Sequence, residues 1–128
     1  MVSDRFRTDS GLVLVEAEVS GPSGKVAARL VLDTGATSTT LNVKLLGSIG
    51  YDPQAVGEFV RMTTGSAVER VPRLMVNRLS ALGRHAIGSR VLAHDLPPGA
   101  AVDGLLGLDF LRGSRLTIDY RTGQIDLS

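Results

Sequence analysis

Two apolar segments joined by a short polar turn constrain the fold of this chain more than any other feature. In residues 12–19, one set of alternate positions is apolar throughout and the other begins apolar and turns acidic, which predicts a half-buried β-strand. Residues 21–25 contain two glycines and a proline, and the apolar segment 26–32 follows them. The sequence therefore predicts a β-hairpin that ends at Asp33.

The rest of the chain is also mostly strand-like. Residues 59–79 have the pattern of two strands around a bend at 63–66, which contains Gly65 and three hydroxyl residues. Residues 81–99 predict further short strands, interrupted by glycines and by a Pro-Pro pair. The segment 116–127 predicts a closing hairpin, so the fold class is mainly β.

Two segments favour helix. Residues 41–50 carry apolar residues at helical spacing, with Thr40 or Asn42 as a possible N-cap and glycines near the end. Residues 103–114 place an apolar run between glycines and leave room for one helical turn. We therefore expect one or two short helices.

A chain of 128 residues is long enough for one hydrophobic core. Residues 1–10 are polar and charged, and we assign residues 11–128 to a single domain. No linker, internal repeat, signal peptide or apolar stretch of membrane-spanning length occurs in the sequence. We therefore expect no membrane partner and, by default, a cytoplasmic location.

The composition argues against several classes of function. The formal net charge is +1, aromatic residues make up 4% of the chain and tryptophan is absent, so we expect no nucleic-acid partner. The absence of cysteine excludes disulfides and thiolate chemistry. His85 and His94 have no third ligand at a suitable spacing. We therefore expect no metal and no cofactor.

The segment 28–42, ARLVLDTGATSTTLN, contains the most informative motif. An Asp-Thr-Gly triplet is by itself more typical of a turn. Here, however, an apolar strand precedes it, and a second block, VDGLLGLDFL, follows about seventy residues later at 102–111. The two blocks, in this order and separation, resemble a retropepsin-type aspartic protease, and most closely the bacterial, single-domain, Gag-polyprotein-like members. The resemblance extends from about residue 11 to the C-terminus.

The resemblance implies a retropepsin-like half-barrel that forms a two-fold dimer, with Asp33 as the catalytic carboxylate. Thr34, Gly35 and Ala36 would complete the active-site loop. The Thr34 hydroxyl would brace the two loops of the dimer across its axis. Gly35 would allow a tight backbone and offer its amide to the carboxylate.

The second block would form a supporting loop of Leu105, Leu106 and Gly107, in which the glycine packs against the active-site loop. Viral members usually have an arginine at the next position, where this chain has Leu108. Their arginine-based salt bridge at the interface is therefore not expected here.

The resemblance also places a flap, a mobile hairpin over the substrate, on residues 60–71. Apolar substrate pockets would be lined from positions such as Leu30, Val60 and Met62 and from the region around Leu105. The flap residues near the tip are Met62, Thr63, Thr64, Gly65 and Ser66.

The chemistry of this family needs two facing carboxylates that share a proton, because like charges so close cannot both ionise. The chain has one Asp-Thr-Gly, and the nearest internal alternative, at 118–123, separates Asp119 from its Thr-Gly pair. We therefore predict a homodimeric aspartic endopeptidase that acts on peptide or protein substrates. The apolar, alternating segment 124–128 is expected to join an intermolecular sheet.

Two alternatives remain open. The same dimer fold could bind extended peptides by strand addition without cutting them, as an interaction module. An acyl- or phosphotransferase is less favoured, because residues 38–40 have no histidine in an activating motif and no phosphate-binding glycine loop is present. Asp103 and Asp109 are expected to be a turn residue and a helix cap, and Asp119 and Asp126 to face outward from strands.

Overall fold

The computed structural model describes residues 2–128, except for the side chain of Thr64. The predicted N-terminal hairpin forms from β2 (Leu14–Gly21) and β3 (Gly24–Leu32), which pair antiparallel along their whole length. The buried positions of β2 alternate with its two exposed glutamates. The hairpin ends at Asp33, as the pattern predicts.

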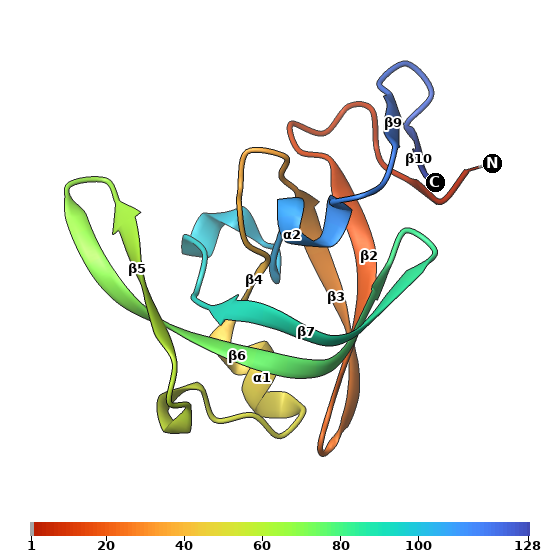
Figure 1. Cartoon of the computed structure of the whole chain (residues 1–128). Helices are drawn as coiled ribbons and strands as arrows, with labels where there is room; N and C mark the ends of the chain where they lie inside the picture. Colours follow the sequence, from red (N-terminus) through yellow and green to blue (C-terminus); the bar gives the residue numbers. More distant parts are fainter. Residues whose placement is uncertain (1) are drawn as a thin grey trace.

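Seven strands form the main sheet, in the order β2-β3-β8-β4-β7-β6-β5. An additional pairing between β2 and the end of β6 closes six of these strands into a barrel (Figure 1). The predicted mainly β architecture is therefore confirmed. The remaining strands of this sheet are β4 (Thr40–Leu41), β5 (Phe59–Thr64), β6 (Ala67–Ala81), β7 (Arg84–Ala93) and β8 (Gly104–Leu106).

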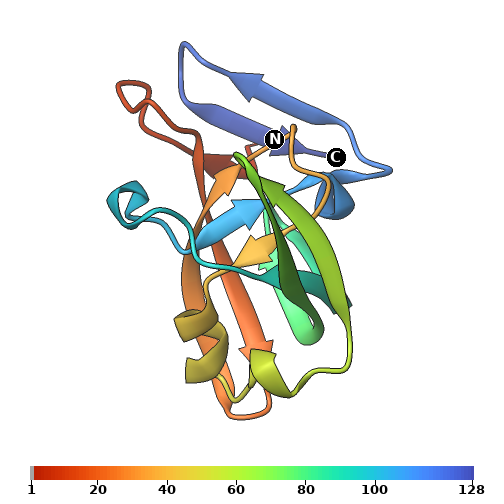
Figure 2. The same ribbon diagram turned by 90° about the vertical axis from the view of Figure 1, so that its left-hand side faces the viewer.

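Strand β6 belongs both to the barrel and to a projecting hairpin. Its residues 67–72 pair with β5, and its residues 73–81 pair with β7. The β5–β6 hairpin extends away from the barrel and turns at Gly65 and Ser66, the predicted bend (Figures 1 and 2). The prediction of several short strands within residues 81–99 was wrong, because the ten-residue β7 runs on through Gly88, where φ is +65°.

A separate three-stranded sheet brings the two ends of the chain together. It has the order β1-β10-β9, formed by β1 (Asp4–Arg5), β10 (Gln124–Leu127) and β9 (Leu116–Asp119). Strand β10 is in the middle, so both of its edges already have partners within one chain. Among the described strands, β9 pairs with β10 alone and keeps one free edge. Strand β1 likewise pairs with β10 alone, so the outer edges of this sheet are those of β1 and β9. The expectation that residues 124–128 join an intermolecular sheet stays a prediction.

Two α-helices, α1 (Val43–Ser48) and α2 (Leu108–Leu111), and two short 3₁₀ turns, η1 (Pro53–Ala55) and η2 (Pro98–Ala100), connect the strands. Asn42 occupies the N-cap position of α1, but its side chain makes no capping bond. Its amide instead donates to the Val102 carbonyl at 3.2 Å and accepts from the Leu96 N–H at 3.3 Å. No helix in the described part of the chain is long and apolar enough to span a membrane.

The core fills the barrel with aliphatic side chains. Leu30 is 0% exposed and lies in this core, so its predicted place in a substrate pocket was wrong. The other largest fully buried side chains include those of Val15, Val19, Leu41, Leu46, Leu79, Leu106 and Ile125.

Candidate active site

Asp33 is held at the point where β3 leaves the barrel. Strand β3 pairs in parallel with β8, with Leu32 opposite Leu106. The Asp33 N–H then donates to the Leu106 carbonyl at 3.0 Å. The backbone of the aspartate is therefore fixed by the barrel, while its side chain is half-buried at the start of the loop that connects β3 to β4.

Among the described residues, the carboxylate of Asp33 has one hydrogen-bond donor. Its Oδ1 accepts a hydrogen bond from the Gly35 N–H at 3.0 Å, which is the contact implied for that amide. No other hydrogen bond or ion pair to this carboxylate comes from residues 2–128. Thr34 and Gly35 are exposed, and the Thr34 hydroxyl has no hydrogen-bond partner among the described residues.

The segment from β8 to α2 supports this loop from behind. The Leu108 N–H donates to the Ala36 carbonyl at 2.8 Å. A side chain at Gly107 would meet backbone atoms, because a Cβ atom there would lie 2.8 Å from the Ser38 carbonyl carbon and 2.9 Å from the Ala36 oxygen. Leu106 is fully buried beneath the same contact. The two sequence blocks that carried the resemblance are therefore in direct contact.

Asp109 makes a second tie to the loop that the sequence did not predict. Both of its carboxylate oxygens accept from the Thr39 N–H at 3.0 Å, and its Oδ1 also accepts from the buried Thr39 hydroxyl at 2.7 Å. The helix-cap prediction for this residue was wrong, since Gly107 holds the N-cap position of α2. No local sequence pattern predicts these hydrogen bonds, because the two partners are 70 residues apart and meet only in the folded chain.

The β5–β6 hairpin and the β3–β4 loop enclose a cavity of about 420 Å³, which we call the cleft. The hairpin stands at about the same level as the loop in two perpendicular views (Figures 1 and 2). Glu69 on the outer part of β6 contacts the His94 ring through Oε2 and Nε2 at 2.8 Å. The cleft is lined by Ala36, Thr37, Ser38, Thr40, Val60, Arg61, Met62, Thr63, Leu92 and Leu105.

The structure brings only some of the predicted site residues to the cleft. The segments expected to be active-site loop, flap and supporting loop each contribute to its lining, and so does Val60. The Thr64 side chain lies outside the described part of the structure. The other predicted site residues do not line the cleft of one chain: Asp33, Thr34, Gly35, Gly65, Ser66, Leu106 and Gly107.

Acidic and histidine side chains elsewhere are dispersed. No group of three or more metal-ligating side chains with suitable geometry occurs in the described residues. Asp119 accepts from the backbone N–H groups of Arg121 and Thr122 at 2.9 and 3.2 Å. The bond from Thr122, and then that from Arg121, lowers the pKa of the Asp119 carboxyl. This aspartate stabilises the β9–β10 turn.

Comparisons with known proteins agree with the fold and with the two sequence blocks. A family model described as aspartyl protease matches residues 15–110. The structure is similar to the crystal structure of a retropepsin-like aspartic protease from Rickettsia conorii, with a TM-score of 0.64 and 18% sequence identity over 90% of this chain and 82% of that one. No curated protein matches the sequence. The retropepsin-like fold predicted from the sequence is therefore confirmed.

Proposed function

Because the chain belongs to the aspartyl protease family, we propose that it is a homodimeric endopeptidase whose active site contains two Asp33 side chains, one from each copy. One carboxylate takes a proton from a water molecule as the water attacks the peptide carbonyl carbon. The other donates its proton to the carbonyl oxygen. When the C–N bond breaks, the proton that the first group gained passes to the leaving nitrogen, and a hydroxyl proton of the intermediate returns to the second group, which restores the pair.

The observation that carries this proposal is the state of Asp33 in a single chain. Its backbone is anchored to β8, yet its carboxylate accepts only the Gly35 amide among the described residues. Within residues 2–128 no second acid contacts it, and Asp119, the nearest internal alternative by sequence, is engaged in its own turn. The described part of a single chain therefore holds one positioned carboxylate without a facing acid, which a second copy would supply.

The exposed surface around Asp33 supports a two-fold arrangement. Thr34 and Gly35 are exposed and the Thr34 hydroxyl has no partner within the described part of one chain. Two copies related by a two-fold axis at this loop would pair equivalent groups with each other. The cleft of one chain, which does not include Asp33 in its lining, would then be one half of a longer substrate-binding groove.

The non-catalytic alternative is tested by cleavage. We expect the purified protein to cut an unstructured protein or peptide, and we expect Asp33→Asn to lower kcat/KM by at least about a thousandfold, because the site loses its acid–base pair. Mass spectrometry identifies the cut bonds, and circular dichroism and sedimentation check that the variant folds and assembles normally. Binding of peptides without any Asp33-dependent cleavage would instead support the interaction module.

The hairpin β5–β6 is proposed as the flap, and its tip can be tested separately. Gly65 has a φ of +57° with open space around it, so Gly65→Val strains the turn without a clash. We expect turnover to fall by about tenfold or more, because loop closure contributes to catalysis. Gly83→Val is the matched control, since Gly83 also has a positive φ, +75°, and open space, but lies in the turn between β6 and β7. Equal losses of activity per folded protein in both variants would contradict the flap assignment.

A further inference from the structure

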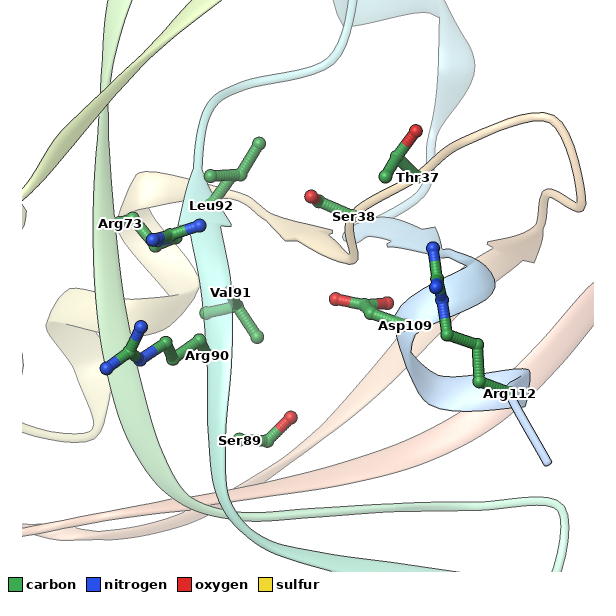
Figure 3. Close-up of a pocket in the computed structure, with 9 residues that line it drawn as sticks. All are labelled: Thr37, Ser38, Arg73, Ser89, Arg90, Val91, Leu92, Asp109 and Arg112. Carbon is green, nitrogen blue, oxygen red and sulfur yellow. The ribbon is translucent and has the colours of Figure 1, made fainter.

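A second cavity, of about 350 Å³, adjoins the cleft. Thr37, Ser38 and Leu92 line both cavities, so the second one adjoins the cleft at the β3–β4 loop and β7. Figure 3 shows this cavity with β7 along one wall and the β3–β4 loop and α2 along the other. We call it the arginine pocket, because three of its nine lining residues are Arg73, Arg90 and Arg112.

The arginines come from three different elements. Arg73 on β6 and Arg90 on β7 lie on one side of the pocket, and Arg112 at the end of α2 lies on the other (Figure 3). The Arg73 Nε donates to Glu58 Oε1 at 2.5 Å, so this guanidinium is already paired. Arg90 is only loosely associated with the same oxygen, at 3.9 Å.

Arg112 has no carboxylate within ion-pair distance among the described residues. The one acid that lines the pocket is Asp109, and its oxygens accept from the N–H and hydroxyl of Thr39 and from the Phe110 N–H. That acid is therefore committed to holding the loop. Arg90 is ion-paired to Glu58 and its guanidinium points away from Arg112 in Figure 3, so Arg112 is the guanidinium that remains available to an anionic ligand.

We propose that the arginine pocket binds an acidic side chain, Asp or Glu, of the peptide substrate. This inference rests on the proposed function. Asp33 lines neither this pocket nor the adjoining cleft, so the acidic residue is placed away from the scissile bond. Arginine forks recognise carboxylates with two parallel hydrogen bonds, which favours an ionised side chain over its neutral amide.

In a two-fold dimer, the preference for an acidic residue should occur at two positions of the substrate. Each copy in the dimer contributes one arginine pocket, and the two pockets lie on opposite sides of the Asp33 pair. The preference for an acidic residue therefore occurs at two positions, one on each side of the scissile bond. A selectivity confined to one side contradicts the paired pockets.

The test compares peptides that differ only by Glu against Gln, with the substituted position moved along the sequence. We expect the Glu peptide to have a kcat/KM about tenfold above that of its Gln twin at the preferred positions, and less at high salt. Arg112→Gln should remove most of this ratio, and Arg112→Glu should favour a Lys peptide instead. Arg121→Gln is the control, because Arg121 is exposed in the β9–β10 turn and outside the pocket, and it should leave the ratio unchanged.

Binding provides a second readout that does not need catalysis. Fluorescein-labelled Glu and Gln peptides are titrated with Asp33→Asn protein, with and without Arg112→Gln, and followed by anisotropy. Tighter binding of the Glu peptide that depends on Arg112 supports the inference even if no cleavage is found. Asp33-dependent cleavage with equal rates for Glu and Gln peptides overturns the inference and leaves the proposed function intact. If no Asp33-dependent cleavage occurs, the proposed function is overturned. The binding titration then tests by itself whether the arginine pocket prefers the Glu peptide.

Discussion

Mixing the wild-type protein with about a ninefold excess of Asp33→Asn is expected to reduce activity per wild-type chain about tenfold, because random pairing leaves a wild-type chain with a wild-type partner about one time in ten. The mixed dimer keeps one carboxylate and loses the acid–base pair, so it contributes almost no turnover. The experiment follows activity against the mutant fraction after the two proteins have been allowed to exchange subunits. A quadratic dependence of total activity on the wild-type fraction is the expected signature.

The control for this mixture is the double variant Asp33→Asn with a charge substitution at Thr34, such as Thr34→Lys. The exposed Thr34 is proposed to lie at the two-fold axis, so this variant should dimerise poorly and should not poison the wild type. Sedimentation gives the mass of each species. Full activity in a species that sediments as a monomer would show that both carboxylates belong to one chain.

The second large effect is expected at Gly107, where even one methyl group is excluded. The φ of this residue is −101°, which any residue adopts, so the effect of Gly107→Ala is purely steric. The Cβ atom must push back the backbone of Ser38 and Ala36, and overpacking of this kind costs about 1–3 kcal/mol of the free energy of unfolding. We expect the melting temperature to fall by several degrees.

The activity of Gly107→Ala should fall further than its stability alone requires. The displaced backbone belongs to the loop that begins at Asp33, and a shift of about 1 Å in a catalytic group can cost about a hundredfold in rate. Gly57→Ala is the matched control, because a Cβ atom at Gly57 meets nothing within 4 Å. Thermal unfolding and kcat/KM are measured for both variants. A Gly107→Ala protein with wild-type values of both would show that the second sequence block does not position the site.

Local patterns predicted the elements of this fold that lie within one stretch of sequence. The alternation in residues 12–19 and the glycines around it were enough to place the first hairpin and to end it at Asp33. The bend at Gly65 and the closing hairpin were predicted for the same reason. The strand-pairing of β2 with the end of β6 was not predictable, since it joins segments about sixty residues apart that carry no complementary pattern.

Those parts of the candidate site that lie in sequence motifs could be proposed from the sequence. Asp33 and Gly107 stand in recognisable blocks, whereas the tie from Asp109 to Thr39 depends on how those blocks meet in space. The arginine pocket is a still clearer case, because its arginines come from three elements and look like scattered surface charges in the sequence. The central place of β10 was missed because alternation predicts a strand but not which edges are already paired.

The two halves of strand β6 are expected to tolerate substitutions differently. Beyond Pro72, which has no N–H to donate, the strand is part of the closed barrel, and its residues Leu74, Val76 and Leu79 are buried in the core. Before Pro72, the strand pairs with β5 alone among the described strands, and its residues 67–70 are exposed. Substitutions in this outer half leave the hydrogen bonds of the barrel intact. The chain can therefore acquire new residues on the outer strand of this hairpin, behind the β5 residues that line the cleft, at little cost to the stability of its fold.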